Sequence, residues 1–146
     1  MPDASRARRV LVVDDEPLIR WSLTQALQDG GFEVRQAASG ADAVRCAMSD
    51  DAFAVVLLDF RLPDSDSLTL LAQLRQLLPE AAVILMTAYS TPEVAQGALE
   101  LGAVRVVGKP FDMSEMASLV AACERPGESQ GLSSVEPRQV DIEGNT

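Results

Sequence analysis

Apolar runs alternate with amphipathic stretches along residues 9–123 of this chain. Five short runs, rich in Val, Leu, Ile and Ala, predict β-strands at residues 9–13, 33–37, 54–58, 82–86 and 104–107. Five stretches with helical spacing of apolar positions predict helices at residues 17–30, 41–48, 68–78, 92–101 and 113–123. Because strands that alternate with helices form βαβ units, the pattern predicts an α/β fold around a parallel sheet.

Local signals mark several of the predicted helix ends. Pro17 suits the first turn of a helix, where no backbone N–H is needed. Ser39 and Thr91 are predicted N-caps, and residues 112–115 have the spacing of a capping box. Gly102 predicts a left-handed stop after the fourth helix.

Two helices carry residues with a specific expected role. The second helix is predicted to turn Val44, Ala47 and Met48 toward the core. Gly97 lies inside the fourth helix, where a glycine costs on the order of 1 kcal/mol relative to alanine. It either keeps that helix marginal and ready to move or permits close packing against a neighbour.

Residues 9–124 form the predicted domain, because a chain of this length can bury one ordinary core. Residues 1–8 and 125–146 are predicted to be disordered. The second of these stretches is polar, carries Gly, Pro and Ser at irregular intervals and shows no apolar period. It is either a native tail or the remnant of a linker to an output domain.

The composition argues against several classes of function. A formal net charge of −10 and a pI near 4.3 disfavour direct contact with nucleic acid or an anionic membrane. No apolar stretch reaches the length of a membrane span, which predicts a cytoplasmic protein. The chain has no histidine, so Ser-His-Asp catalysis and histidine-ligated metal sites are excluded. Cys46 and Cys123 are predicted to be reduced thiols.

Polar side chains follow four of the predicted strands. Residues 14–16 (DDE) follow the first, Asp59 the third, Thr87 the fourth, and Lys109 the fifth. Because the carboxyl ends of parallel strands meet at one edge of a sheet, these side chains are expected to share one pocket.

The residue types in this pocket indicate phosphoryl chemistry. Carboxylates in one cleft repel, which raises their pKa unless a cation binds, and Mg²⁺ suits a shallow acidic cleft. Lys109 is expected to pair with Asp59 and, when a phosphoryl group is present, with one of its oxygens. Thr87 supplies a hydroxyl. The set predicts a site that holds a phosphoryl group on a carboxylate.

Each signature also has a simpler explanation when taken alone. The acidic residues 14–16 could complement a helix dipole, and Asp59 could be a turn residue. Thr87 could be a strand-end hydroxyl, and Lys109 could lie in an exposed loop. These explanations require four coincidences in the same order along the chain.

Four motifs in this chain resemble a response-regulator receiver domain of two-component signalling. They are residues 12–17 (VVDDEP), 57–63 (LLDFRLP), 86–88 (MTA) and 109–111 (KPF). The resemblance implies a flavodoxin-like fold, with a doubly wound sheet of five parallel strands in the order 2-1-3-4-5 and five helices. It also implies a cis peptide bond before Pro110.

The resemblance implies a role for each site residue. Asp59 would be the phosphoacceptor, Lys109 would contact the phosphoryl group, and Thr87 would be the switch hydroxyl. The implied Mg²⁺ ligands are the carboxylates of Asp14, Asp15 and Asp59 and the backbone carbonyl of Arg61.

This chain departs from the family at three positions. Val106 stands where the family usually has an aromatic residue that reports phosphorylation, so the aromatic half of the switch is missing. Ser67 stands where a glycine often ends the loop after the phosphoacceptor strand, and Gly108 precedes the lysine where a proline is common. Arg61 and Tyr89 occupy positions that in this family tune the lifetime of the phosphate.

The resemblance implies partners as well. The phosphoryl donor would be a phosphohistidine on a sensor histidine kinase or a histidine phosphotransfer protein. The chain would then be a signalling domain rather than an enzyme, apart from self-phosphorylation and autodephosphorylation at Asp59. A homodimer through the fourth helix, fifth strand and fifth helix is a further candidate. The first helix resembles that of receivers attached to AAA+ transcriptional activators.

Leu18 and Trp21 lie three residues apart and off the inner stripe of the first helix. They are predicted to form an exposed apolar spot that docks the phosphodonor. Packing of Trp21 at the helix edge is the alternative.

Two other functions stay open at this point. One is a receiver-like scaffold that does not switch, which Val106 favours. The other is a small Mg²⁺-dependent phosphatase with an aspartate nucleophile. Such enzymes need an acid two residues after the nucleophile, and here that residue is Arg61.

Overall fold

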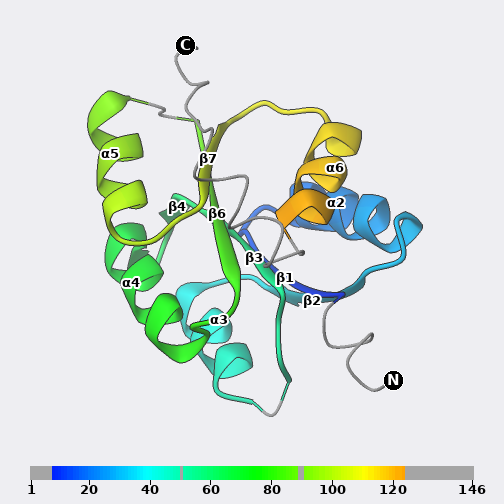
Figure 1. Ribbon diagram of the computed structural model, residues 1–146, viewed down its shortest axis with the longest axis horizontal. Coiled ribbons are helices and arrows are strands. Elements are labelled where there is room, and N and C mark those ends of the chain that lie inside the picture. The colour runs from blue at the N-terminus through cyan, green and yellow to red at the C-terminus, as the bar shows by residue number, and fades with distance from the viewer. Residues whose placement is uncertain (1–7, 50, 89–90, 124–146) are drawn as a thin grey trace.

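The computed structural model describes residues 8–49, 51–88 and 91–123, which form a parallel sheet with helices on both faces (Figure 1). The sheet has five strands in the order β2-β1-β3-β6-β7. Their bounds are Arg9–Val13 (β1), Glu33–Ala37 (β2), Val55–Asp59 (β3), Ala82–Thr87 (β6) and Arg105–Gly108 (β7). Since β6 and β7 are the fourth and fifth strands of this sheet along the chain, the predicted order 2-1-3-4-5 is confirmed.

The composition of each strand follows from its place in the sheet. The central strand β3 is buried along its whole length, and β6 is buried in all but its first residue. Both are almost wholly apolar because helices cover them on both faces. The edge strands β2 and β7 expose several residues, which explains their mixed sequences.

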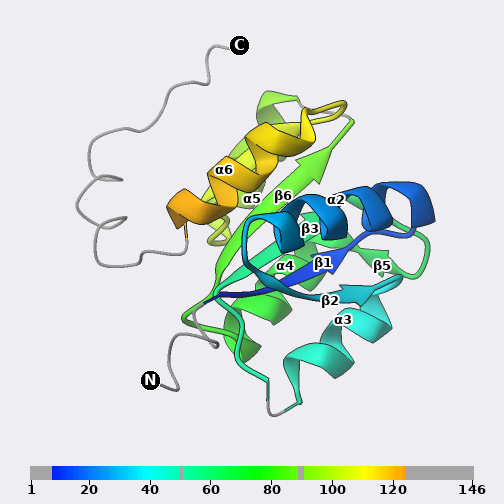
Figure 2. The same cartoon turned by 90° about the vertical axis from the view of Figure 1, so that its right-hand side faces the viewer.

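Two layers of helices cover the sheet (Figures 1 and 2). The helices are α2 (Pro17–Asp29), α3 (Gly40–Ala47), α4 (Ser67–Leu77), α5 (Pro92–Glu100) and α6 (Met113–Cys123). Leu23 and Leu27 of α2 pack with Met116 and Val120 of α6 in one apolar cluster. A second cluster holds the buried side chains of α3, α4 and α5 on the other face. The doubly wound α/β fold is therefore confirmed.

The predicted helix ends are largely confirmed. The Ser39 hydroxyl accepts a hydrogen bond from the Asp42 N–H, and Thr91 accepts one from the Val94 N–H. The Asp112 carboxylate accepts from the N–H groups of the two residues after Met113. Gly102 has φ +109°, as expected of a left-handed stop, and the Lys109–Pro110 bond is cis.

Two features differ from the sequence-based expectation. Met48 is 69% exposed rather than turned inward, because α3 ends at Ala47 and the buried face is taken by Ala43 and Ala47. A separate antiparallel ribbon of β4 (Arg61–Leu62) and β5 (Ser65–Asp66) follows β3. Strands of two residues are too short for any apolar period to predict.

Within the described part of the chain, no helix has both the length and the apolar character needed to cross a membrane. The predicted disordered segments, residues 1–8 and 125–146, lie outside the described residues apart from Arg8. The division of the chain at residues 9 and 124 stays a prediction.

Candidate functional site

The polar residues that follow the strands meet at the carboxyl edge of the sheet, as the sequence predicts. Asp14 follows β1, and its N–H donates to the carbonyl of Ala37 at 3.1 Å. Asp59 and Thr87 are the last residues of β3 and β6. Lys109 follows β7, and its N–H donates to the Thr87 carbonyl at 2.7 Å. Backbone hydrogen bonds between neighbouring strands therefore fix the backbone positions from which these side chains project.

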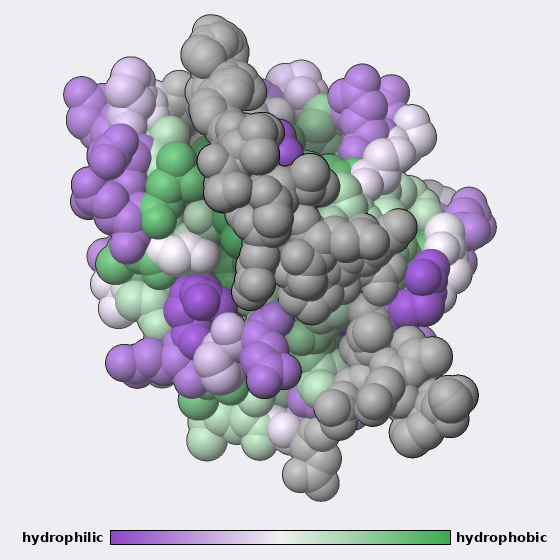
Figure 3. Space-filling view, viewed as in Figure 1, coloured by the Kyte–Doolittle hydropathy of each residue, from purple (hydrophilic) through white to green (hydrophobic). Residues whose placement is uncertain are grey.

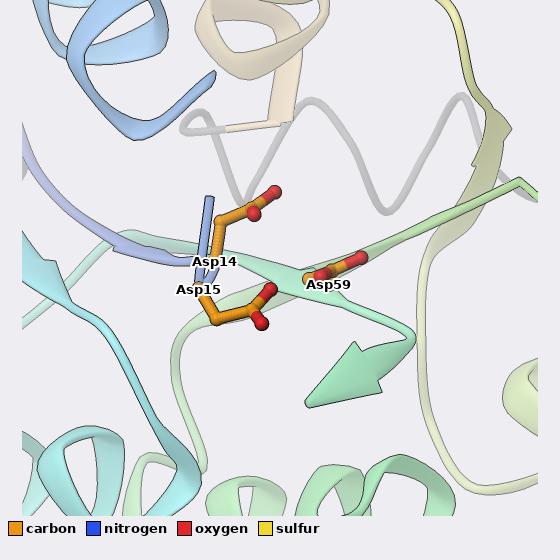
Figure 4. Close-up of side chains that lie close together, drawn as sticks. All are labelled: Asp14, Asp15 and Asp59. Carbon is orange, nitrogen blue, oxygen red and sulfur yellow. The ribbon is translucent and has the colours of Figure 1, made fainter. Parts of the chain in front are cut away.

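Three carboxylates converge in this corner of the sheet (Figure 4). Asp14 and Asp15 come from the segment after β1, and Asp59 comes from β3. One oxygen of each lies within 4.8 Å of the others. Asp14 and Asp59 are 0% and 3% exposed, whereas Asp15 is exposed to solvent. The cluster thus has a buried side and an open side.

Lys109 supplies the positive charge next to these carboxylates. Its Nζ donates to Asp59 Oδ1 at 3.0 Å and to Asp14 Oδ2 at 3.2 Å, and lies 3.8 Å from Glu16 Oε1. The pair with Asp59 was expected from the sequence, whereas the bond to Asp14 was not. One ammonium group therefore bridges the two buried acids.

Burial and neighbouring charge shift both members of this pair. Burial raises the pKa of Asp59, and the charge of Asp14 acts in the same direction, while the Lys109 hydrogen bond opposes them without cancelling them. Burial lowers the pKa of Lys109, but the hydrogen bond to Asp59 and the charge of Asp14 outweigh it and leave the pKa raised. Lys109 stays protonated, and Asp59 is more basic than an exposed aspartate.

The donor set fits a hard divalent cation. The two buried carboxylates share the ammonium of Lys109 and the exposed carboxylate of Asp15 lies beside them, so the three acids outnumber this ammonium. All the candidate ligand atoms are oxygens, which Mg²⁺ prefers. The corner opens into a cleft of about 610 Å³ that has room for water and a phosphoryl group. The cleft is lined by Asp15, Glu16, Asp59, Arg61, Leu62, Pro63, Ala88 and Lys109.

The two residues assigned to the switch lie at different depths. Thr87 is fully buried at the end of β6. Val106 pairs with Leu85 in the ladder between β6 and β7 and is half-buried against the cluster under α3, α4 and α5. Tyr89, a predicted lifetime residue, lies outside the described residues. The roles of Thr87 and Val106 stay predictions.

The predicted apolar spot on α2 is present. Leu18 is 73% exposed and Trp21 is 58% exposed, so both project from the helix into solvent. The alternative was that Trp21 packs at the edge of the helix, but more than half of this residue is exposed to solvent. The docking role of the two residues stays a prediction.

Sequence reasoning missed three side-chain contacts at or near the site. Arg20 donates to the backbone carbonyl of Asp14 at 2.8 Å, and Ser67 donates to the backbone carbonyl of Asp59 at 3.1 Å. Asp64 binds the N-terminus of α3. The only sequence signal for any of these contacts was the serine at position 67, where a glycine was expected.

Comparisons with known proteins agree with this geometry. The family model of the response regulator receiver domain matches residues 10–121. The DNA-binding transcriptional regulator NtrC of Escherichia coli is 36% identical over 137 residues, which cover 94% of this chain and 28% of NtrC. The transcriptional regulatory protein PrrA of Mycobacterium tuberculosis is 36% identical over 141 residues, covering 93% of this chain and 60% of PrrA. The chain thus spans only part of each relative.

Solved structures share the fold. A CheY-like receiver domain protein from Methanospirillum hungatei superposes with a TM-score of 0.78 and 28% identity, covering 85% of this chain and 98% of that one. The BeF₃-activated receiver domain of DrrB, a Thermotoga maritima protein, gives a TM-score of 0.72 and 30% identity, covering 79% and 95%.

Proposed function

Because this chain belongs to the family of response regulator receiver domains, we propose that it accepts a phosphoryl group on Asp59. One observation carries the proposal: Asp59, only 3% exposed, lines a cleft in which Lys109 Nζ lies 3.0 Å from Asp59 Oδ1. A buried carboxylate of raised pKa beside a fixed ammonium suits a nucleophile whose product gains negative charge. In the cytoplasm, the donor would be a phosphohistidine on a sensor histidine kinase or a histidine phosphotransfer protein.

The transfer is a single displacement at phosphorus. An Asp59 oxygen attacks the phosphorus atom, the P–N bond to the donor imidazole breaks, and its electron pair stays on the imidazole nitrogen. Lys109 is held by Asp14 and Asp59, so its ammonium is in place before charge develops on the phosphoryl oxygens. The cleft orients the acceptor and so reduces the entropy cost of the encounter.

Asp14, Asp15, Asp59 and the backbone carbonyl of Arg61 would hold Mg²⁺ beside the phosphoryl group. When bound, the cation supplies positive charge that offsets the phosphoryl oxygens. Asp15 is the exposed member of the cluster and lies on the side of the site that is open to solvent. Asp14 is fixed from behind by Arg20.

Phosphorylation would shift a population of conformations. The acyl phosphate carries roughly two negative charges where the carboxylate carried one, so it adds roughly one negative charge at the sheet edge. Thr87 and Lys109 would then contact the phosphoryl oxygens, and movement of these side chains would reach β7 and α5. A shift of this kind changes which partner surface is exposed without changing the fold.

A mass measurement tests the phosphoacceptor proposal. Wild type incubated with Mg²⁺ and acetyl phosphate should gain the mass of one phosphoryl group, and beryllofluoride should give a spectral change. Asp59→Asn should give neither. The matched control Asp42→Asn, which removes a carboxylate from α3, should behave as wild type. No mass gain in wild type, or an unchanged gain in Asp59→Asn, would overturn the proposal.

We propose Leu18 and Trp21 as the docking spot for the phosphodonor. If they dock it, Trp21→Ala slows transfer from the cognate kinase roughly tenfold but leaves phosphorylation by acetyl phosphate unchanged, because one aromatic anchor contributes on the order of 1–2 kcal/mol. Leu99→Ala, which trims an exposed side chain on α5, is the matched control. Equal kinase rates for wild type and Trp21→Ala would exclude the spot.

We propose a phosphorylation-dependent homodimer through α5, β7 and α6. This region exposes Leu99 at the end of α5 and Leu101 and Val104 in the connection between α5 and β7. Sedimentation of the protein with and without beryllofluoride checks the idea, and a monomer under both conditions would contradict it.

A non-switching scaffold is the second candidate, and Val106 is the observation that favours it. A half-buried valine has no aromatic ring to rotate between two positions. Phosphorylation that changes neither the oligomeric state nor the affinity for a partner would support the scaffold over the switch.

A further inference from the structure

A small hairpin follows the proposed phosphoacceptor and returns the chain to it. Arg61 of β4 pairs with Asp66 of β5, and Leu62 pairs with Ser65, so the chain turns at Pro63 and Asp64. The next residue, Ser67, begins α4. Arg61, Leu62 and Pro63 all line the cleft of the candidate site. The position of this hairpin therefore determines one wall of the cleft.

The base of the hairpin is closed by a buried hydroxyl. Ser67 Oγ donates to the backbone carbonyl of Asp59 at 3.1 Å, eight residues earlier in the chain, and Ser67 is 3% exposed. A glycine at this position would have no group to make the bond. A buried hydrogen bond of this kind contributes about 0.5–1.5 kcal/mol, so it restrains the return of the chain to β3.

The tip of the hairpin is tied to another helix. Asp64 Oδ1 accepts from the Gly40 N–H at 2.8 Å, and Asp64 Oδ2 accepts from the Ala41 N–H at 3.1 Å. These N–H groups belong to the first turn of α3, where helical amides lack partners within the helix and favour a negative charge. The two hydrogen bonds of Asp64 thus fix the tip of the hairpin against the N-terminus of α3.

We propose that Ser67 and Asp64 are positioning residues that clamp this hairpin at its base and tip and so fix the position of the Arg61 backbone carbonyl, which would be a ligand of the cation. This role rests on the cation site of the proposed function. Arg61 lies in the sequence between Asp59, whose carbonyl Ser67 holds, and Asp64 at the tip. The carboxylates of Asp14 and Asp15 come from a different segment and do not depend on the clamp. Loosening the clamp therefore weakens one ligand of the site and leaves the acidic cluster in place.

The test is Mg²⁺ binding to the full chain without a phosphodonor, measured by isothermal titration calorimetry. Ser67→Ala and Asp64→Ala each raise the Kd for Mg²⁺ roughly three- to tenfold, the loss expected from one restraining hydrogen bond. The matched control is Ser39→Ala, which removes a different cap of α3, the hydrogen bond from the Asp42 N–H. It lowers stability but leaves the Kd unchanged.

Amide hydrogen exchange provides a second readout that general destabilisation does not mimic. In the Mg²⁺-free protein, the amides of the hairpin exchange faster in Ser67→Ala and Asp64→Ala, while those of β1 and β3 keep their wild-type rates. In Ser39→Ala the hairpin amides stay as in wild type. If Ser67→Ala does not fold, Asp64→Ala, which alters an exposed side chain, still decides the question.

Three results separate this inference from the proposed function. Kd values within twofold of wild type in both clamp variants overturn the clamp, as does a wild type that binds no Mg²⁺. A wild type that binds Mg²⁺ with the expected dependence on Ser67 and Asp64, yet gains no phosphoryl mass, supports the clamp and overturns only the phosphoacceptor role.

Discussion

The acidic corner of the sheet and the region of α5 and β7 are built in opposite ways. In the corner, Asp14 and Asp59 are buried and share the ammonium of Lys109, and further side chains hold their backbones from behind. In α5, Ala98 is the one residue that is fully buried, and no residue of β7 is.

The region of α5 and β7 also exposes apolar side chains at its surface. Leu99, Leu101 and Val104 are 47%, 40% and 51% exposed. Figure 3 shows apolar patches between hydrophilic ones on the side of the molecule where α5 lies. The contrast teaches that the site proposed for the phosphoryl group is preorganised, whereas the region expected to respond to phosphorylation is held by few buried contacts.

The largest expected effect comes from removing the ammonium in the corner. Lys109→Ala leaves Asp14 and Asp59 buried without their partner and should lower the free energy of unfolding by about 2–4 kcal/mol at neutral pH. Urea unfolding measures the loss, and Mg²⁺ should restore most of it because a cation takes over the role of the ammonium. Arg45→Ala, which breaks an exposed pair with Asp42, should cost less than about 1 kcal/mol.

The pH dependence of Lys109→Ala has a definite sign. Burial already raises the pKa of Asp59 above its unfolded value, and loss of Lys109 raises it further. The folded state then binds protons more tightly than the unfolded state, so the variant regains stability relative to wild type as the pH falls through the raised pKa. A loss of stability relative to wild type that grows as the pH falls would contradict the raised pKa of Asp59.

A pair of valines compares the packing of the two regions. Val83 on β6 is fully buried and Val106 on β7 is half-buried, and both belong to the same side of the sheet. Val83→Ala should lower the free energy of unfolding by about 2–3 kcal/mol and Val106→Ala by about 1 kcal/mol, since less apolar area leaves water. Equal losses of unfolding free energy in the two variants, measured by urea unfolding, would contradict the difference in packing between the two regions.

Two glycines, Gly97 inside α5 and Gly102 just after it, give smaller effects of opposite sign. A Cβ at Gly97 would meet Leu68 Cδ1 at 3.5 Å, an ordinary contact, so Gly97→Ala should stabilise the protein by about 0.5–1 kcal/mol. Close packing therefore does not require this glycine. Gly102→Ala should destabilise by about 1–2 kcal/mol because φ is +109° and its Cβ would lie 2.8 Å from Arg75 Nε. Urea unfolding of the two variants distinguishes a marginal helix from a tightly packed one.

The smallest effect concerns the cap of α6. The hydrogen bond from Ser114 and the nearby N–H groups lower the pKa of Asp112 below its ordinary value. The cap therefore stabilises the fold above the unfolded pKa of aspartate, and this contribution is lost as the pH falls through the lowered pKa. Asp112→Ala should lower the Tm slightly at neutral pH and converge on wild type in strong acid. A constant difference in Tm across that range would contradict this.

The sequence predicted most of the fold because the strands and helices are long enough to carry a period. The end of each strand was also predictable, and with it the convergence of Asp59, Thr87 and Lys109. Met48 was misplaced because the helical period was extended one residue past the end of α3. The expected exposure of Leu18 and Trp21 followed from their spacing on α2.

The contacts behind the site could not be predicted, because they join residues that no local pattern relates. The bond from Ser67 to the Asp59 carbonyl depends on a hairpin of two-residue strands. Asp64 reaches α3 across 24 positions of sequence. Only the three-dimensional path of the chain brings such groups together, and none of them leaves a period or a motif.

The most direct test of the central claim is to locate the phosphoryl group after reaction with acetyl phosphate and Mg²⁺. Borohydride reduction converts an aspartyl phosphate to homoserine, which peptide mass spectrometry can place on a single residue. The account predicts homoserine at Asp59 and nowhere else in the chain. Homoserine at Asp14 or Asp15, or at no position, would contradict it.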